Sequence, residues 1–166
     1  MKPHTIHLLV TLLLGLFLIN SSLDAMSADF KSMGDEPANG KAHYFGLNAG
    51  FTTGIGFSYR YMPARNGIQL AGIPLYDRNH FYMSAGLTYL HTIRQYDFGR
   101  ALFFVGNQLT NFFNEQKYAY NAGIGLGGDI EAGNFVINLM IGYAAINIFE
   151  DFKTRPAAEL GILFNF

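Results

Sequence analysis

A serine, a histidine and a carboxylate lie close together in the middle of the chain, as Ser84, His80 and Asp77. These residue types can act together in acyl transfer, where the serine attacks, the histidine takes its proton and the acid orients the histidine. In an extended strand, however, His80 and Ser84 lie about 13 Å apart, too far for a hydrogen bond. We therefore expect no catalytic residue and no enzymatic activity.

The histidines are the other candidates for chemistry, as ligands of a metal ion. His4 and His7 fall in the apolar start of the chain, and His43, His80 and His91 lie on separate stretches. Structural metal sites instead use short, regular ligand spacings. We expect neither a metal nor a cofactor.

The composition indicates a surface that does not face water throughout. Half of the residues are hydrophobic and 14% are charged, against roughly 25% charged residues in an ordinary soluble domain. The absence of cysteine excludes disulfides, and the formal net charge of −1 gives no reason to expect nucleic acid as a partner.

Residues 1–28 have the pattern of a signal peptide, with a positive start at Lys2 and an apolar run over residues 6–19. Small residues allow cleavage after Ala25 or Ala28. The alternative is a membrane anchor, but the run is shorter than the ~20 residues that a spanning helix needs. Residues 29–41 are polar and rich in turn formers, which predicts a flexible lead-in before a domain over residues 42–166.

From His43 onward the apolar residues alternate with period two, which is typical of strands. Turn signals separate eight such segments, and residues 129–134 and 150–156 are interpreted as the last two connections. Pro74 predicts a strand end or a bulge, and the two faces of the fifth segment do not separate well. The expected strands cover residues 43–51, 54–62, 68–76, 80–93, 100–110, 118–127, 135–144 and 157–166.

On most of these strands one face is large and apolar, while the other carries Gly, Asn, Ser or Thr with few charges. A soluble sandwich would place Lys and Glu on its outer face. The pattern instead favours an all-β, eight-stranded, antiparallel up-and-down transmembrane barrel, with large residues toward lipid and small ones filling a narrow interior. Lipid offers no partner to an unpaired backbone group, so such a sheet must close on itself.

Tyrosines at strand ends, on the apolar face, are expected to form the aromatic girdles found at the boundary between lipid and water. The predicted girdle residues are Tyr59, Tyr61, Tyr89, Tyr118, Tyr120 and Tyr143.

These features resemble the small eight-stranded outer-membrane barrels of Gram-negative bacteria, the OmpA/OmpX-like class. The closing segment AAELGILFNF, with Leu160, Ile162, Phe164 and Phe166 on one face, is the most specific part of the resemblance. In that class a last strand ending in Phe is implied to be the signal read by the barrel-assembly machinery. The segment TGIGFSYRYMP (residues 53–63) is also similar to segments of small barrels from Bacteroidota.

Several polar residues fall on the inward face and are expected to fill the interior. Arg60 and Glu159 are too far apart along the barrel, at about 20 Å, to form one pair. We expect Arg60 to contact Asn165 or a periplasmic acid, and Glu159 to contact Asn48 or a basic loop residue. The predicted interior polar residues are Asn48, Arg60, Asn121, Asn138, Glu159 and Asn165.

The connections at residues 52–53, 76–80, 111–117 and 149–156 are short and mixed in charge, and we expect them to be solvated caps. The sequence thus predicts a monomeric, porin-like barrel of a bacterial outer membrane, with a structural or surface-interaction role. Its partners would be outer-membrane lipid, lipopolysaccharide and the assembly machinery. The alternatives are a lipid-modifying enzyme of the same fold, an exported lipocalin-like binder of apolar ligands, or a narrow channel.

Overall fold

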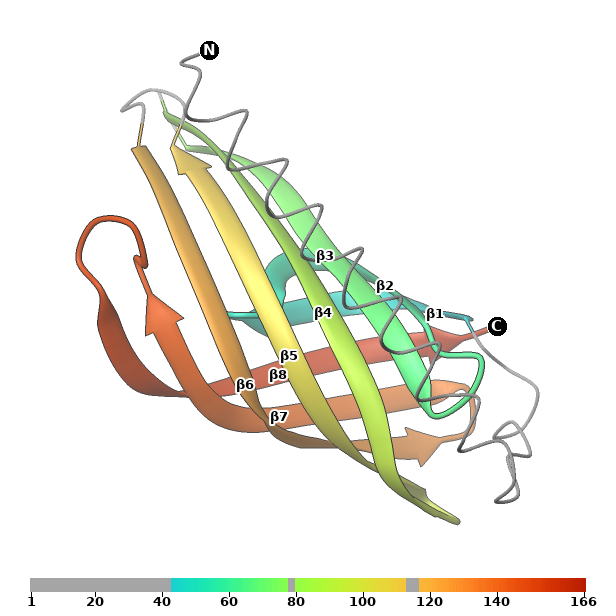
Figure 1. The fold of residues 1–166 in the computed structure, drawn as a ribbon. Helices are drawn as coiled ribbons and strands as arrows, with labels where there is room; N and C mark the ends of the chain where they lie inside the picture. The colour runs from blue at the N-terminus through green and yellow to red at the C-terminus, as the bar shows by residue number, and fades with distance from the viewer. Residues whose placement is uncertain (1–42, 78–79, 113–116) are drawn as a thin grey trace. The chain divides into compact units, whose positions relative to one another are not determined.

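The computed structural model describes residues 43–77, 80–112 and 117–166. They form one antiparallel sheet that closes into a barrel in chain order, so the predicted eight-stranded barrel is confirmed (Figure 1). The predicted signal peptide (residues 1–28) and lead-in (residues 29–41) lie outside the described residues. The strands are β1 (His43–Gly50), β2 (Gly54–Tyr61), β3 (Asn66–Asp77), β4 (His80–Tyr96), β5 (Gly99–Phe112), β6 (Lys117–Ala132), β7 (Phe135–Ile146) and β8 (Lys153–Asn165).

The described residues are extended or in turns, and they include no helix of the length and hydropathy needed to cross a membrane.

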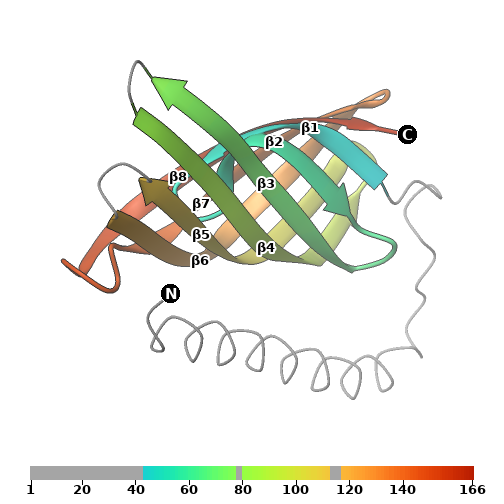
Figure 2. The ribbon, with the colours of Figure 1, turned by 90° about the horizontal axis from the view of Figure 1, so that it is seen from above.

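The barrel closes where its first and last strands pair. Tyr44 lies opposite Asn165 and Ala49 lies opposite Leu160 in an antiparallel ladder (Figure 2). The end of the barrel where β1 begins and β8 ends is called the near end below, and the opposite end is called the far end.

Side chains alternate between the two faces of the wall over most of each strand. In β2, Ile55 and Phe57 are exposed while Ser58 and Arg60 are buried. In the fifth segment the sequence did not distinguish an inner from an outer face. The structure shows the same alternation there, with Leu102 and Phe104 inside and Val105 outside. Period-two patterning therefore places apolar side chains on the outer surface of the barrel.

Two expected connections are wrong in their bounds. Residues 129–132 continue β6, and only residues 133–134 turn into β7. Residues 153–156 belong to β8 instead of the preceding loop. In both cases, polar residues and turn formers stand inside regular strands, because the neighbouring strand supplies their backbone hydrogen bonds.

The prediction that Pro74 marks a strand end or bulge is also wrong. Pro74 lies within β3, opposite Met83 of β4. The ladder between β2 and β3 stops at the pair of Phe57 and Gly72. Beyond that pair β3 has a free edge, and a residue without an N–H is tolerated on an edge strand.

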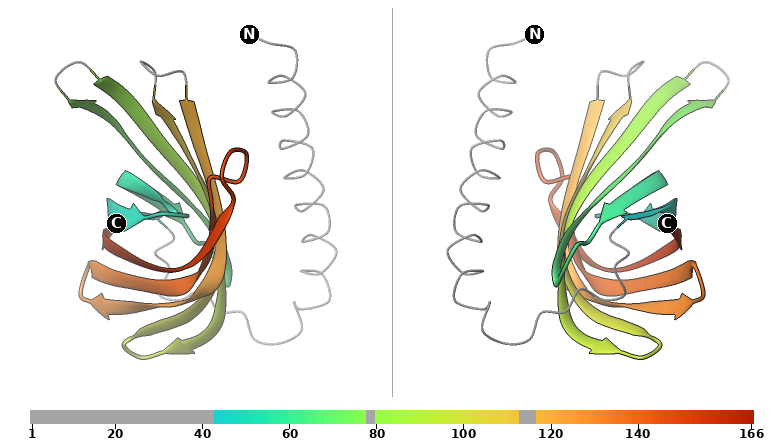
Figure 3. Two further views of the ribbon diagram at one scale, coloured as in Figure 1. Left: turned by 90° about the vertical axis from the view of Figure 1, so that its left-hand side faces the viewer. Right: turned by 90° about the vertical axis from the view of Figure 1, so that its right-hand side faces the viewer.

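The strands differ in length, and this makes the far end uneven. β1 and β2 have 8 residues each, whereas β4 has 17 and β6 has 16. The hairpins of β3 with β4 and of β5 with β6 therefore extend past β1 and β2 (Figure 3). On the other side, the described ladder between β1 and β8 ends at Leu160, so residues 153–159 of β8 have no partner on β1.

Candidate functional site in the barrel interior

An apolar cluster closes the barrel toward its near end. Tyr44, Met62, Leu90, Val136 and Leu163 come from different parts of the wall, and each is at most 3% exposed. Leu102, Phe104 and Met140 extend this cluster inward. An eight-stranded barrel just has room for side chains, so these residues fill its width.

A network of charged side chains lies against this cluster, centred on Asp129 of β6. Nη1 of Arg60 donates to both carboxylate oxygens of Asp129, at 2.9 and 2.8 Å. Nε of Arg100 donates to Oδ2 of Asp129 at 2.7 Å. The side-chain amide of Asn138 donates to Oδ1 at 2.6 Å. Three donors from β2, β5 and β7 thus converge on one carboxylate.

The two arginines extend the network to other strands. Nε of Arg60 donates to Gln69 on β3 at 2.8 Å, and Nη2 of Arg100 donates to the hydroxyl of Tyr44 on β1 at 2.7 Å. The guanidinium of Arg100 also lies over the Tyr44 ring, 5.1 Å from its centroid. Glu131 approaches Arg100 at 3.7 Å and adds a second negative charge. Buried charges are stable only when they are paired and hydrogen-bonded, and this network meets both conditions for Asp129.

The main partner of Arg60 was only partly anticipated. Arg60 contacts an acid, but the acid is Asp129 inside strand β6, in a segment that was expected to turn. Asn165 is buried as well, and the described hydrogen bonds of Arg60 go to Gln69 and Asp129. Asp129 lies an even number of residues after Gly123, so both residues face the interior. This pattern can be recognised only once β6 is known to extend through residue 132.

Glu159 lies in a second polar cluster, where it binds the turn between β1 and β2. This turn (residues 51–53), called the inner turn below, folds into the barrel, and Thr52 and Thr53 are both buried. The backbone N–H of Thr52 donates to Oε1 of Glu159 at 3.1 Å. The hydroxyls of Thr52 and Thr53 donate to the same carboxylate, one to each oxygen. Asn48 donates to the Thr53 hydroxyl at 2.7 Å and to the Gly54 carbonyl at 2.8 Å.

The opposite wall has room for the inner turn because it carries glycine there. A Cβ on Gly106 of β5 would lie 2.6 Å from the carbonyl oxygen of Thr52. A Cβ on Gly123 of β6 would lie 2.6 Å from Cγ2 of the same threonine. A Cβ on Gly86 of β4 would lie 2.4 Å from the carbonyl oxygen of Thr53. The inner turn therefore spans the barrel from β8 to β4, β5 and β6.

The prediction that residues 52–53 form a solvated cap is wrong, because both threonines are buried. Glu159 was expected to contact Asn48 or a basic loop residue; its described partners are Thr52 and Thr53, and Asn48 belongs to the same cluster. The two strands that flank the turn are short. The turn therefore lies inside the barrel, against the glycines of the longer strands β4, β5 and β6. Thr52 and Thr53 supply the hydrogen bonds that a buried carboxylate needs, and Asn48 is linked to Glu159 through Thr53.

The other predicted interior residues and girdle residues are placed as follows. Asn121 is buried beside the inner turn, where it donates to the Phe51 carbonyl at 3.1 Å. Tyr89 and Tyr120 are half-buried, with Tyr89 donating to Asn66 at 2.8 Å. The remaining predicted girdle residues are exposed on the outer face, namely Tyr59, Tyr61, Tyr118 and Tyr143.

Of Ser84, His80 and Asp77, the residues weighed for catalysis, only Ser84 has a described side chain. Ser84 accepts a hydrogen bond from Gln108 at 2.9 Å. Asp77 and His80 are paired in register, but their side chains lie outside the described structure. His43 lies 2.8 Å from the Tyr59 hydroxyl, and His91 lies 2.7 Å from Asn66, on another strand. Over residues 43–77, 80–112 and 117–166, no three metal-ligating side chains gather.

The closing strand presents its apolar side chains outward and ties its end to β1. Leu160, Ile162 and Phe164 are exposed. The N–H of Phe166 donates to the carbonyl of His43 at 3.2 Å, and the two rings stack with centroids 6.1 Å apart.

The fold and its interior define a small antiparallel β-barrel, closed on itself and filled by its own side chains and inner turn. No protein-family model, no curated protein and no solved structure matches the chain.

Proposed function

We propose that this protein is an integral barrel of a bacterial outer membrane, exported by its N-terminal signal, with a structural or surface-interaction role and no catalysis. Its partners in this proposal are outer-membrane lipid, lipopolysaccharide and the barrel-assembly machinery that reads the last strand. It acts as a monomer.

The observation that carries this proposal is the inversion of polarity across the wall. Phe57, Leu126 and Ile141, on well-separated strands, are 56%, 55% and 67% exposed, while Arg60, Asp129 and Glu159 are buried. Apolar surface of this extent is unfavourable in water. Against lipid, it is the arrangement expected of a transmembrane barrel.

The alternatives are less consistent with the interior. A lipocalin-like binder needs an apolar cavity inside, but here the interior holds an ion network and an inserted turn. A lipid-modifying enzyme needs a serine beside a histidine, and the described partner of Ser84 is Gln108. A channel needs a continuous bore, which the apolar cluster and the inner turn both obstruct.

Cell fractionation tests the proposal, combined with electrophoresis of heated and unheated samples. We expect the protein in the outer-membrane fraction, with a band that shifts on heating because a closed barrel resists detergent until it is boiled. A soluble periplasmic protein would contradict the proposal.

A further inference from the structure

A side-chain amide faces outward from the interior of strand β5. Gly106 and Gln108, the chain neighbours of Asn107, are buried. Val105 and Leu109, which share its face, are 44% and 42% exposed. The alternation along the strand therefore directs the Asn107 side chain to the outer wall, where it is half-buried.

Apolar side chains surround Asn107 on that wall. Leu87 of β4 and Ala122 of β6 lie directly opposite it in the two ladders. The exposed apolar surface continues past it in both directions, with Met83 of β4 toward the far end and Leu126 of β6 toward the near end. Asn107 therefore lies within the apolar surface and not at its border.

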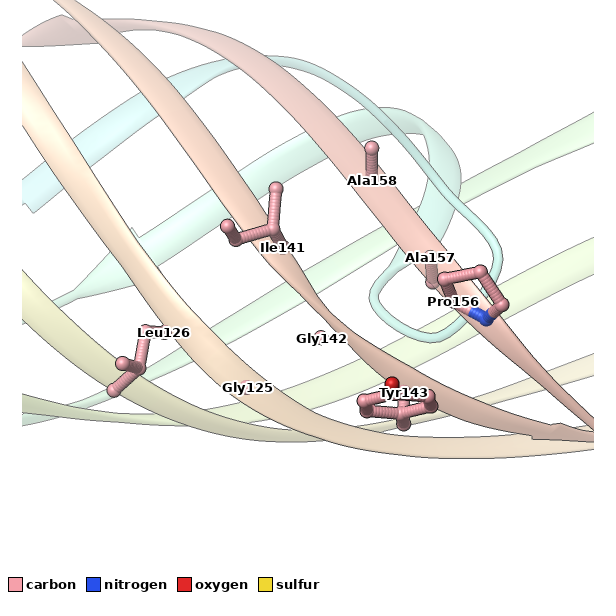
Figure 4. Close-up of a pocket in the computed structure, with 8 residues that line it drawn as sticks. All are labelled: Gly125, Leu126, Ile141, Gly142, Tyr143, Pro156, Ala157 and Ala158. Atoms are coloured by element: carbon pink, nitrogen blue, oxygen red, sulfur yellow. The ribbon is translucent and has the colours of Figure 1, made fainter.

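Three other polar side chains of the outer wall lie at strand ends. Asn66 is the first residue of β3, Thr154 is the second of β8, and Asn111 is the last but one of β5. Asn107 is five residues before the end of β5. Further around the wall, a hollow over β6, β7 and β8 is lined by residues without charge (Figure 4). An amide in the middle of a strand is thus unlike the rest of this surface.

A side-chain amide that faces hydrocarbon needs a hydrogen-bond partner. It carries two N–H donors and a carbonyl acceptor, and removing such groups from water without a partner is unfavourable. Within the described part of the chain, the Asn107 side chain has no hydrogen bond. Leu87, Val105, Leu109 and Ala122 have apolar side chains and can supply none. In lipid, the partner of Asn107 must therefore come from another molecule.

We infer that Asn107 joins two copies of this barrel in the membrane, the amide of each donating to the carbonyl oxygen of the other. The partial charges of an amide are complementary to those of a second amide, so a copy of the chain supplies both a donor and an acceptor. A two-fold axis along the membrane normal brings the same residue of two copies together. Polar side chains hold membrane segments together in this way.

The inference rests on the proposed function, because it requires the outer wall to face lipid. Each barrel closes on its own, so the pair is a reversible contact between folded monomers. The contact face is the wall around Asn107 on β4, β5 and β6, and β1 lies on the opposite side of the barrel.

The chain contains no cysteine, so one introduced cysteine can carry a dye. Asp97→Cys lies in the exposed turn between β4 and β5. One batch of this variant is labelled with a donor dye and another with an acceptor dye, and both are reconstituted into phosphatidylcholine vesicles at increasing lipid dilution. Energy transfer above the level of random proximity measures pairing.

We expect saturable energy transfer, and adding Asn107→Leu should weaken the pairing about tenfold. This substitution makes the wall more apolar, so the barrel should still fold, and a heat-shifted band checks that it does. Asn111→Leu is the matched control, because it makes the same change near the end of the same strand. It should leave the pairing unchanged.

Cross-linking locates the contact while Asn107 is retained. Leu109→Cys lies beside Asn107 on the outer face of β5, whereas Leu47→Cys lies on the outer face of β1. A short bismaleimide should join two copies of the first variant and leave the second monomeric. Adding Asn107→Leu to Leu109→Cys should reduce the cross-linked band.

Energy transfer no greater than random proximity would overturn the dimer and leave the proposed function standing. Transfer that Asn107→Leu does not weaken would also overturn it, as would equal cross-linking of the two cysteine variants, because the contact would then lie elsewhere. Failure of the protein to enter the vesicles in any form would instead contradict the proposed function.

Discussion

The carboxylate of Glu159, on the last strand of the barrel, accepts a hydrogen bond from the backbone N–H of Thr52, in the turn between the first two strands. The two residues are 107 positions apart in the chain. The contact joins β8, the strand that closes the barrel, to the inner turn. The turn therefore has these hydrogen bonds only when β8 is in place.

Glu159→Gln should therefore destabilise the barrel. The variant keeps the shape of the side chain but removes the charge that accepts three hydrogen bonds, each worth about 1.5–3 kcal/mol when the acceptor is charged. We expect a loss of about 2–4 kcal/mol overall, measured by urea unfolding of the protein in detergent. Thr52→Val should act in the same direction by a smaller amount. An unchanged unfolding midpoint in both variants would contradict the structure of this cluster.

Asp129→Asn should be one of the most damaging single changes, because it leaves Arg60 and Arg100 buried beside each other without their shared carboxylate. Breaking a buried pair from one side costs about 3–5 kcal/mol. The matched control is Asp151→Asn, whose pair with Lys153 is exposed and should be worth no more than about 1 kcal/mol. Equal effects of the two substitutions in an unfolding titration would argue against the buried network.

Gly106→Ala should displace the inner turn, because its Cβ would lie 2.6 Å from the Thr52 carbonyl oxygen. Overpacking of this kind costs about 1–3 kcal/mol. Gly128→Ala is the control, since the nearest atom to its Cβ is the Arg100 carbonyl oxygen at 3.5 Å, an ordinary contact. Hydrogen exchange of the Thr52 and Thr53 amides should rise in the first variant only.

Leu47→Arg tests the proposed lipid-facing wall. An arginine on the lipid face near the middle of the membrane costs about 2–4 kcal/mol, while one near the interface costs about 0–1. Phe98→Arg, in the turn between β4 and β5, provides the interfacial comparison. Refolding yields into lipid vesicles should fall for the first variant and stay near normal for the second. Similar yields would count against a membrane-embedded wall at β1.

Deletion of Phe166 should impair assembly in cells more than deletion within any loop, because the proposed assembly signal ends at this residue. The aromatic contact with His43 offers a simpler, local explanation for such a defect. His43→Ala separates the two, since it removes the contact and keeps the signal. Quantifying the heat-shifted band for each variant decides the matter, and normal levels without Phe166 would refute the proposed signal.

The strands and their inward and outward faces could be predicted from the sequence because both depend on local alternation. In β2, the exposure of Phe57 and the burial of Arg60 follow directly from that alternation. The direction of the inner turn could not be predicted in this way. Thr52 and Thr53 are ordinary residues for an exposed turn, and their burial depends on the relative lengths of distant strands.

The ion network was missed for a related reason. Asp129 stands in a stretch with several turn formers, of which only Gly133 and Asn134 make the turn. Its three partners come from β2, β5 and β7, and their convergence depends on the register around the whole barrel. The residues that leave space for the inner turn are glycines on the inward face, such as Gly106 and Gly123.

The hydrogen bond from Thr52 to Glu159 also joins parts of the chain that are synthesised far apart in time. Synthesis delivers the donor with the first hairpin and the acceptor with the last strand. Until then, water must solvate the two threonine hydroxyls and the Thr52 amide. Burial of these donors without water therefore requires the last strand to be in place.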